Sequence, residues 1–140
     1  MVGPRRTRNS LRMASDARGV VEAYFNAWKN NDFALMRSVL DDKLDFAGPI
    51  DRFDNADAYQ RAIQGLSQIK TDIVVHKTFV DGPDVVTWYD LHTRIAPPAP
   101  VAEWSHVEGG KITMVRVVFD ARPFAAAQAP SAQPSGQPAS

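Results

Sequence analysis

The first elements of the fold are set by the stretch VVEAYFNAWKNNDFALMRSVLDDKLDF, residues 20–46. Its apolar residues begin with the spacing i, i+3, i+4, i+7 of a single helix face: Val21, Tyr24, Phe25 and Trp28. The polar run KNND ends that helix. A short second helix follows, and residues 43–48 predict a strand. The inward side chains of the second helix are expected to be Phe33, Met36, Val39 and Leu40.

A third helix is predicted to begin after Asp54 or Asn55, either of which can cap its N-terminus. Its buried stripe would be Tyr59, Ala62, Ile63 and Leu66. From there the period of the apolar residues changes from that of a helix to that of a strand. Four strands are expected, over residues 71–80, 85–95, 101–107 and 111–119. Helices followed by strands joined through tight turns predict an α+β fold. We expect a cone, in which three N-terminal helices pack on a curved, mostly antiparallel sheet and leave a pocket inside.

Both ends of the chain differ in composition from this core. Residues 1–14 are basic and lack an apolar run, so we expect a disordered arm rather than a secretory signal. Residues 125–140 contain Ala, Pro, Ser and Gln with no charged and almost no large apolar side chain, which predicts a disordered tail. The domain itself is therefore expected to span residues 15–124.

Charge and composition limit the classes of function. The 16 Lys and Arg residues balance the 16 Asp and Glu residues, which argues against a nucleic-acid binder and against a protein of anionic membranes. No run approaches the length of a membrane span. The chain has no Cys, so disulfides and thiolate chemistry are excluded, and a cytoplasmic protein is expected. The three His residues lack metal-like spacing, and we expect neither a metal nor another cofactor.

The helix–break–helix–strand segment and the closing hairpin EGGKITMVRVVFDARPF, residues 108–124, resemble the SnoaL-like branch of the nuclear transport factor 2-like superfamily. This branch includes ketosteroid isomerases, limonene-epoxide hydrolases and polyketide cyclases. The similarity extends over roughly residues 17–124. It implies the cystatin-like cone fold with an internal pocket, but not one reaction, because this fold hosts many chemistries.

The resemblance to ketosteroid isomerases implies roles for two residues. Tyr24 takes the position of a tyrosine that donates to the substrate oxyanion. Glu103 takes the position of the second oxyanion donor, a buried acid that an apolar site keeps protonated. The general base of these isomerases maps near Gly48, which has no side chain, although Asp45 and Asp51 lie close in sequence.

The resemblance to limonene-epoxide hydrolases implies a different and incomplete site. Val117 stands where these enzymes carry a catalytic Asp, while Asp45 and Ala47 replace their Tyr and Asn. Their Arg and Asp on the third long strand correspond to Asp90 and His92. Neither known site is intact, so the sequence predicts neither steroid isomerisation nor epoxide hydrolysis as such.

The strand VVTWYDLHT, residues 85–93, carries Trp88, Asp90 and His92 on one face, because side chains alternate across a strand. We expect this row to face the pocket, with Asp90 and His92 as acid and base groups. A shift of one residue would instead turn Tyr89 and Leu91 inward. Supporting roles are expected for Glu103, Tyr24 and Asp45, and the pocket would also be lined by Trp28, Phe46, Trp88, Val117 and Phe119.

Two functions remain open at this point. One is a cofactor-independent isomerase, cyclase or epoxide-hydrolase-like enzyme that acts on a small apolar metabolite. The other is a non-catalytic module of the same fold that binds a small ligand or a protein partner. Trp104 alternates away from Glu103 and is expected on the outer face of the sheet, where it would contact a second copy in a homodimer.

Overall fold

The computed structural model describes residues 2–128 of the chain, with side chains described for residues 16–127. The helices are α1 (Val2–Lys29), α2 (Phe33–Ser38), α3 (Ala56–Leu66) and α4 (Arg122–Gln128). The strands are β1 (Leu40–Ala47), β2 (Arg52–Phe53), β3 (Lys70–Asp81), β4 (Asp84–Thr93), β5 (Ala99–Glu108) and β6 (Lys111–Phe119).

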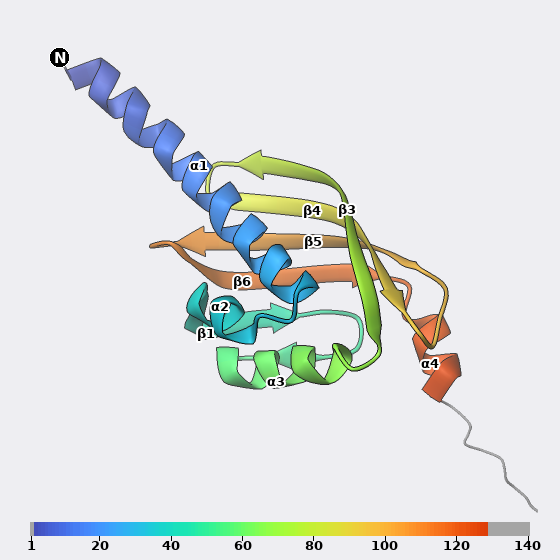
Figure 1. Cartoon of the computed structure of the whole chain (residues 1–140). Coiled ribbons are helices and arrows are strands. Elements are labelled where there is room, and N and C mark those ends of the chain that lie inside the picture. Colours follow the sequence, from blue (N-terminus) through green and yellow to red (C-terminus); the bar gives the residue numbers. More distant parts are fainter. Residues whose placement is uncertain (1, 129–140) are drawn as a thin grey trace, which may run out of the picture.

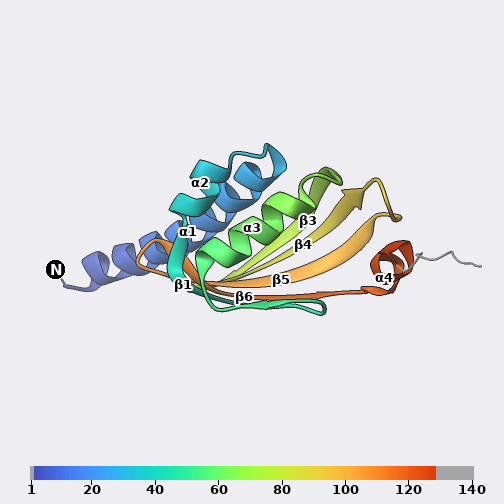
Figure 2. The same ribbon diagram turned by 90° about the horizontal axis from the view of Figure 1, so that it is seen from below.

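The strands form one six-stranded sheet in the order β2-β1-β6-β5-β4-β3. All neighbours are antiparallel except β1 and β6, which run parallel. Figure 1 shows α1, α2 and α3 across one face of the sheet, and the turned view in Figure 2 shows the sheet curving around that side, with α4 at one end. The predicted α+β cone is confirmed.

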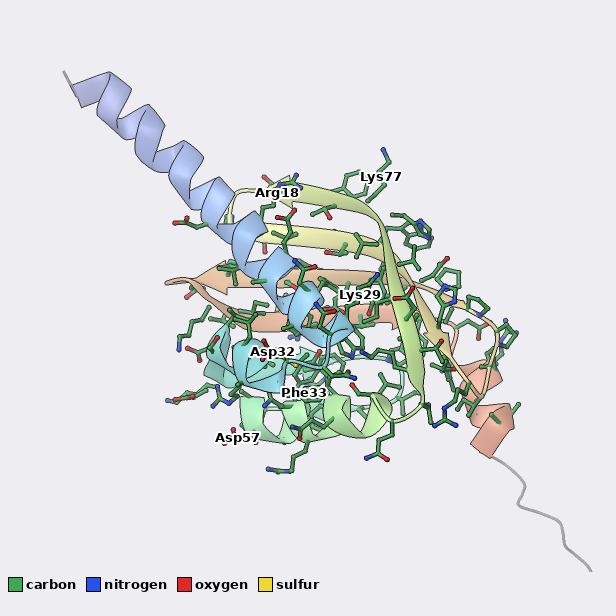
Figure 3. All side chains as sticks on the ribbon, viewed as in Figure 1. Arg18, Lys29, Asp32, Phe33, Asp57 and Lys77 are labelled. Atoms are coloured by element: carbon green, nitrogen blue, oxygen red, sulfur yellow. The ribbon has the colours of Figure 1, made fainter. Side chains whose placement is uncertain are left out.

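Local sequence explains where the first helices begin and end. Asn31 adopts a left-handed conformation with φ of 58°, which Asn tolerates better than most residues, and the chain turns there. Asp32 then caps α2 by accepting a hydrogen bond from the backbone N–H of Leu35 at 3.2 Å (Figure 3 labels Asp32 at this break). Asn55 caps α3 in the same way, through the N–H of Ala58 at 2.8 Å.

The curvature of the sheet has two visible sources. The pairing of β3 with β4 shifts between Val75 and Lys77, and an irregularity of this kind bends a strand and increases its twist. The β5–β6 pairing shifts beside the hairpin, where Gly109 and Gly110 have φ of 59° and 77°. A side chain at either glycine would be strained, so the sequence EGG fixes this turn.

Several boundaries differ from those expected, among them the start of β1 at Leu40, a residue expected on the second helix. The helix α1 continues back to Val2, whereas the sequence predicted a disordered arm before Ser15, because residues 5–14 are mostly good helix formers and Pro4 lies in the first turn. Residues 52–53 form the short strand β2 inside a predicted loop. Residues 122–128 form α4, and the remainder of the predicted tail, residues 129–140, lies outside the described part of the chain.

The inner face of the sheet is lined by alternate residues of the neighbouring strands β4 and β5. On β4 these are Val85, Thr87, Tyr89 and Leu91, and on β5 they are Val101, Glu103, Ser105 and Val107, all buried. The row that contains Trp88 therefore lies on the outer face, and Trp88 is 43% exposed. The expectation that Trp88, Asp90 and His92 face the pocket is wrong by one residue of register.

Candidate functional site

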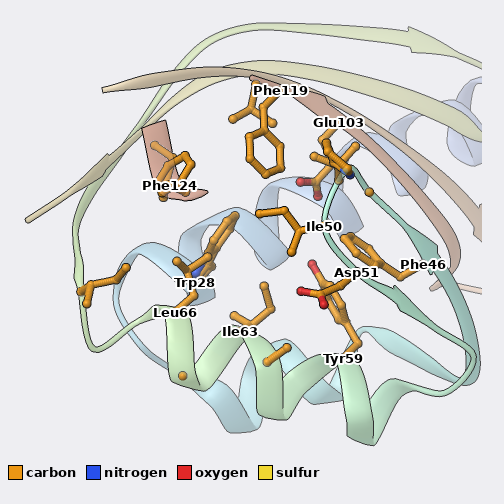
Figure 4. Close-up of a pocket in the computed structure, with 18 of the residues that line it drawn as sticks. Trp28, Phe46, Ile50, Asp51, Tyr59, Ile63, Leu66, Glu103, Phe119 and Phe124 are labelled. Carbon is orange, nitrogen blue, oxygen red and sulfur yellow. The ribbon is translucent and has the colours of Figure 1, made fainter. Parts of the chain in front are cut away.

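A cavity of about 600 Å³ lies between the inner face of the sheet, α3 and α4, and it is lined mostly by apolar side chains. Figure 4 shows Ile63 and Leu66 of α3 on one side of it and Phe119 and Phe124 on the other. This volume lies in the range of pockets that bind small organic molecules. The cavity is therefore large enough for a ligand and offers it few polar partners.

Glu103 is the most unusual side chain of this cavity. It is 1% exposed, and the Tyr89 hydroxyl donates a hydrogen bond of 2.9 Å to its Oε1. The other carboxyl oxygen, Oε2, has no hydrogen-bond partner. Burial raises the pKa of Glu103 from 4.5 to about 7, against the opposing effect of the Tyr89 hydrogen bond. The carboxyl group, which points into the cavity in Figure 4, can therefore be neutral or ionised near neutral pH.

A pair of tyrosines lies beside this acid. The hydroxyls of Tyr24 on α1 and Tyr59 on α3 are hydrogen-bonded to each other, and both side chains are buried. Burial raises the pKa of each hydroxyl well above its usual value, and the nearby Glu103 adds to this rise. Tyr59 lines the cavity and Tyr24 does not, so Tyr24 holds Tyr59 in place and does not itself reach the cavity.

The Tyr59→Phe variant is expected to lose about 1–3 kcal/mol of unfolding free energy, because the fully buried Tyr24 hydroxyl loses its partner. The double variant Tyr24→Phe/Tyr59→Phe is expected to recover most of this loss, because it leaves no unpaired hydroxyl. Urea denaturation of the three proteins measures the effect. A double variant less stable than Tyr59→Phe would contradict the structural role of the pair.

Two further polar side chains line the cavity. Asp51, in the loop before β2, is exposed at one side, and Figure 4 shows its carboxylate turned inward. The indole N–H of Trp28 on α1 is buried and has no hydrogen-bond partner. Together with Glu103 and the two tyrosines of the lining, Tyr59 and Tyr89, these groups can position the polar atoms of an otherwise apolar ligand.

The structure places most of the residues expected to line a pocket around this cavity. Trp28, Phe46, Val117 and Phe119 line the cavity, and Trp88 does not. The prediction for Trp88 is wrong because β4 turns the side chains of Tyr89 and Leu91 toward the cavity.

The residues expected to be catalytic are not brought together. The Asp90 carboxylate lies 2.9 Å from Nε2 of His76, and His92 pairs across the sheet with Asp72, so neither residue lines the cavity. Asp45 forms an ion pair with Arg116 at 2.9 Å and does not line the cavity either. Of the expected set, only Glu103 does, and its catalytic role stays a prediction.

Three polar residues of the cavity are absent from the site predicted by sequence: Asp51, Tyr59 and Tyr89. The alternation of the apolar residues Val85, Tyr89 and Leu91 is a signal for the inward face of β4. The helical spacing of Tyr59 indicates only that it belongs to a buried stripe. The only sequence signal for Asp51 as a cavity residue is its closeness to Gly48. The path of a loop cannot be predicted from the pattern of its side chains.

Membrane spans and metal clusters are both absent from the part of the chain that the structure describes. Within residues 2–128, no helix has both the length and the apolar character needed to cross a membrane. Within the same residues, no group of three or more His, Asp or Glu side chains is arranged to hold a metal ion.

Comparison with known proteins decides the family. A family model described as a SnoaL-like domain matches residues 21–115, well over half of the 140 residues. The chain belongs to the SnoaL-like domain family. The resemblance noted in the sequence is thus confirmed, and the matched segment of this SnoaL-like protein includes Tyr59, Tyr89 and Glu103. No curated protein matches the chain.

Solved structures extend this assignment. A Kribbella flavida protein is 32% identical with a TM-score of 0.74, over 79% of this chain and 91% of that chain. An NTF2-like protein of unknown function from Cytophaga hutchinsonii is 28% identical with a TM-score of 0.70, over 77% and 93%. An LEH-like epoxide hydrolase from M. tuberculosis is 23% identical with a TM-score of 0.69, over 81% and 90%.

At 23% identity, the likeness to the epoxide hydrolase shows the fold alone. More distant structures with this fold are described as a putative ketosteroid isomerase and a putative polyketide cyclase. The SnoaL-like fold of this chain is therefore shared with isomerases, cyclases and epoxide hydrolases, and the choice among such activities depends on its own cavity.

Proposed function

We propose that this SnoaL-like protein is a cofactor-independent enzyme of the isomerase or cyclase type, which moves a proton on a small, mostly apolar carbonyl compound held in the cavity. The observation that carries the proposal is the buried Glu103 carboxyl group, which has an unpartnered oxygen in an otherwise apolar cavity. A buried polar atom without a partner is costly, and a ligand oxygen that accepts its proton would satisfy it.

The proposed proton transfer uses two carboxyl groups. Asp51, exposed and turned into the cavity, removes a proton from the carbon next to the substrate carbonyl. Protonated Glu103 donates a hydrogen bond to the carbonyl oxygen, on which negative charge develops. Where a double bond adjoins the deprotonated carbon, the resulting dienolate takes the proton back from Asp51 at its far carbon. Otherwise the enolate carbon attacks a second carbonyl of the same molecule, and the alkoxide formed there takes the proton from Asp51. The first outcome is an isomerisation and the second a cyclisation.

The surroundings of Glu103 support the donor role. Since its pKa is raised to about 7, the protonated form is well populated at neutral pH, whereas an ordinary glutamate would be ionised. Tyr89 donates to Oε1, which leaves Oε2 to carry the proton toward a ligand. An apolar lining strengthens such a hydrogen bond, because the effective dielectric constant is low there.

The test is exchange of the protons next to a carbonyl, which requires no knowledge of the natural product. Ketones such as 4-phenylbutan-2-one are incubated with the protein in D₂O, and the loss of the corresponding proton signals is followed by NMR. The wild-type protein is expected to accelerate exchange. Asp51→Asn and Glu103→Gln are each expected to lower that rate about 100-fold or more, the usual contribution of general acid–base catalysis.

Asp90→Asn is the matched control, because it removes a carboxylate on the outer face that pairs with His76. It is expected to keep the wild-type rate. Exchange that is unchanged in both cavity variants would contradict the mechanism. Tight binding of the ketones with no exchange at all would favour the non-catalytic ligand-binding module instead.

The outer face of the sheet supports a second role, as a contact between two copies of the chain. Its exposed apolar side chains adjoin across neighbouring strands: Phe79, Val86, Trp88, Trp104 and Val118. Aromatic patches of this kind on a soluble domain mark association surfaces. We infer a homodimer formed through this face.

The Trp104→Asp variant is expected to shift the protein from dimer to monomer, because it places a charge at the centre of the apolar face. Light scattering after size-exclusion chromatography measures the mass of each protein. Lys111→Asp, an exposed substitution in the hairpin, is the control and is expected to stay dimeric. A Trp104→Asp protein with the dimer mass would exclude this face as the interface.

A further inference from the structure

The lining of the cavity has an uneven distribution of charge. Among the residues that line it, the polar side chains are those of Trp28, Asp51, Tyr59, Tyr89 and Glu103. Two of these five are acids. No Lys, Arg or His is among the lining residues in the part of the chain that the structure describes.

Arg116 and Arg52 are adjacent in sequence to the lining residues Val117 and Asp51, and neither cation lines the cavity. Arg116 on β6 contacts both the carboxylate and the backbone carbonyl of Asp45, at 2.9 Å each. Arg52 follows Asp51 but is exposed and does not line the cavity. Among the side chains that the structure describes, Asp51 forms no ion pair. Within residues 16–127 Glu103 forms no ion pair either, so neither acid of the lining has a positive side chain as its partner.

An anionic ligand would meet two unfavourable effects in this cavity. It would lose its hydration in an apolar space without gaining a positive partner. It would also be repelled by Asp51 and by the ionised form of Glu103, and such repulsion is stronger at a low effective dielectric constant than in water. An uncharged ligand meets neither effect, and the unpartnered Glu103 oxygen and Trp28 N–H can still bind its polar atoms.

We propose that the cavity selects its ligand by charge: it binds uncharged, mostly apolar carbonyl compounds and excludes carboxylates and phosphate esters of the same shape. This inference deepens the proposed function, since it assumes that the substrate occupies this cavity. It implies that the reaction acts on a neutral molecule, so a free acid or a phosphorylated metabolite must be converted to an uncharged form before it enters.

The test compares ketones with carboxylates of nearly the same shape. The pairs are 4-phenylbutan-2-one with 3-phenylpropanoate, and 2-acetylnaphthalene with 2-naphthoate, each measured by isothermal titration calorimetry at pH 8. Each carboxylate is expected to bind at least about 30-fold more weakly than its ketone, which is the effect of one like charge at about 8 Å in an effective dielectric constant near 20.

A charge-reversal variant locates the selection. Asp51→Lys is expected to reduce the ketone-to-carboxylate ratio about tenfold or more, because it adds a cation at the cavity. Asp54→Lys makes the same change on an exposed side chain that does not line the cavity, and it is expected to leave the ratio unchanged.

Each outcome bears on the two proposals differently. Equal affinity within a pair, or equal effects of the two lysine variants, would overturn the charge selection. Ketone binding with the expected ratio but without proton exchange would contradict the proposed reaction and support the charge selection. Failure of both ketones and both carboxylates to bind would overturn both proposals.

Discussion

Glu103→Gln is expected to be more stable than the wild-type protein at pH 8 by about 3 kcal/mol, and to differ much less at pH 5. Burial raises the pKa of this carboxyl group from 4.5 to about 7 in the folded state. Because the folded pKa is the higher one, the stability that the group contributes is fully present below about pH 4.5 and is lost as the pH rises through 7. A rise of the pKa from 4.5 to about 7 corresponds to about 3 kcal/mol.

Glutamine stays neutral throughout this pH range, so the unfolding free energy of the variant does not fall through the ionisation of residue 103. The unfolding free energies of both proteins are measured by urea denaturation at pH values from 5 to 8. The comparison between the two proteins cancels the titration of other groups, such as Asp84 and His106, which are unchanged by the substitution. Parallel pH profiles would mean that Glu103 titrates alike in the folded and unfolded states. The same substitution is expected to lower proton exchange, so it would separate stability from activity at a single residue.

Ala62→Trp is expected to weaken the binding of 4-phenylbutan-2-one about 60-fold while the protein stays folded. Ala62 lies on α3 and lines the cavity, so an indole at this position would fill part of the space that the ligand needs. Loss of roughly 100 Å² of apolar ligand contact at about 25 cal/mol per Å² amounts to about 2.5 kcal/mol. At tenfold for each 1.4 kcal/mol, this corresponds to the expected change in affinity.

Gln64→Trp adds the same side chain to an exposed position of α3 that does not line the cavity. It is expected to bind the ketone as the wild-type protein does, and calorimetry of the two variants makes the comparison. An affinity that is unchanged in Ala62→Trp would show that the ligand binds elsewhere. The proposal that the substrate binds in this cavity would then be wrong.

The fold could be read from the sequence because each signal was local. The i, i+3, i+4, i+7 spacing of Val21 and its successors, the cap at Asn55 and the glycines of the EGG turn depend on neighbouring residues only. Their agreement specified the order of elements. The short strand β2 was not predicted, because two residues are too few to show an alternation of polar and apolar side chains. It is defined by its pairing with β1.

The site was less accessible to such reasoning. The face of a strand that turns inward depends on its register. For β4, the prediction placed Trp88, Asp90 and His92 inside because of their chemistry, although the apolar alternation of Tyr89 and Leu91 indicated the other face. Glu103 was indicated by the resemblance, and its burial was not evident from its type, since Glu is rarely buried without a partner. Its hydrogen bond to Tyr89 joins two strands, and one strand alone gives no hint of it.

The most direct test is the titration of the Glu103 carboxyl group by ¹³C NMR, with the assignment made from Glu103→Gln. The structure predicts a pKa of about 7, and a further rise when a neutral ketone fills the cavity and excludes water. A pKa near 4.5 would mean that the group is solvated, and it would contradict both the buried acid and the function proposed from it.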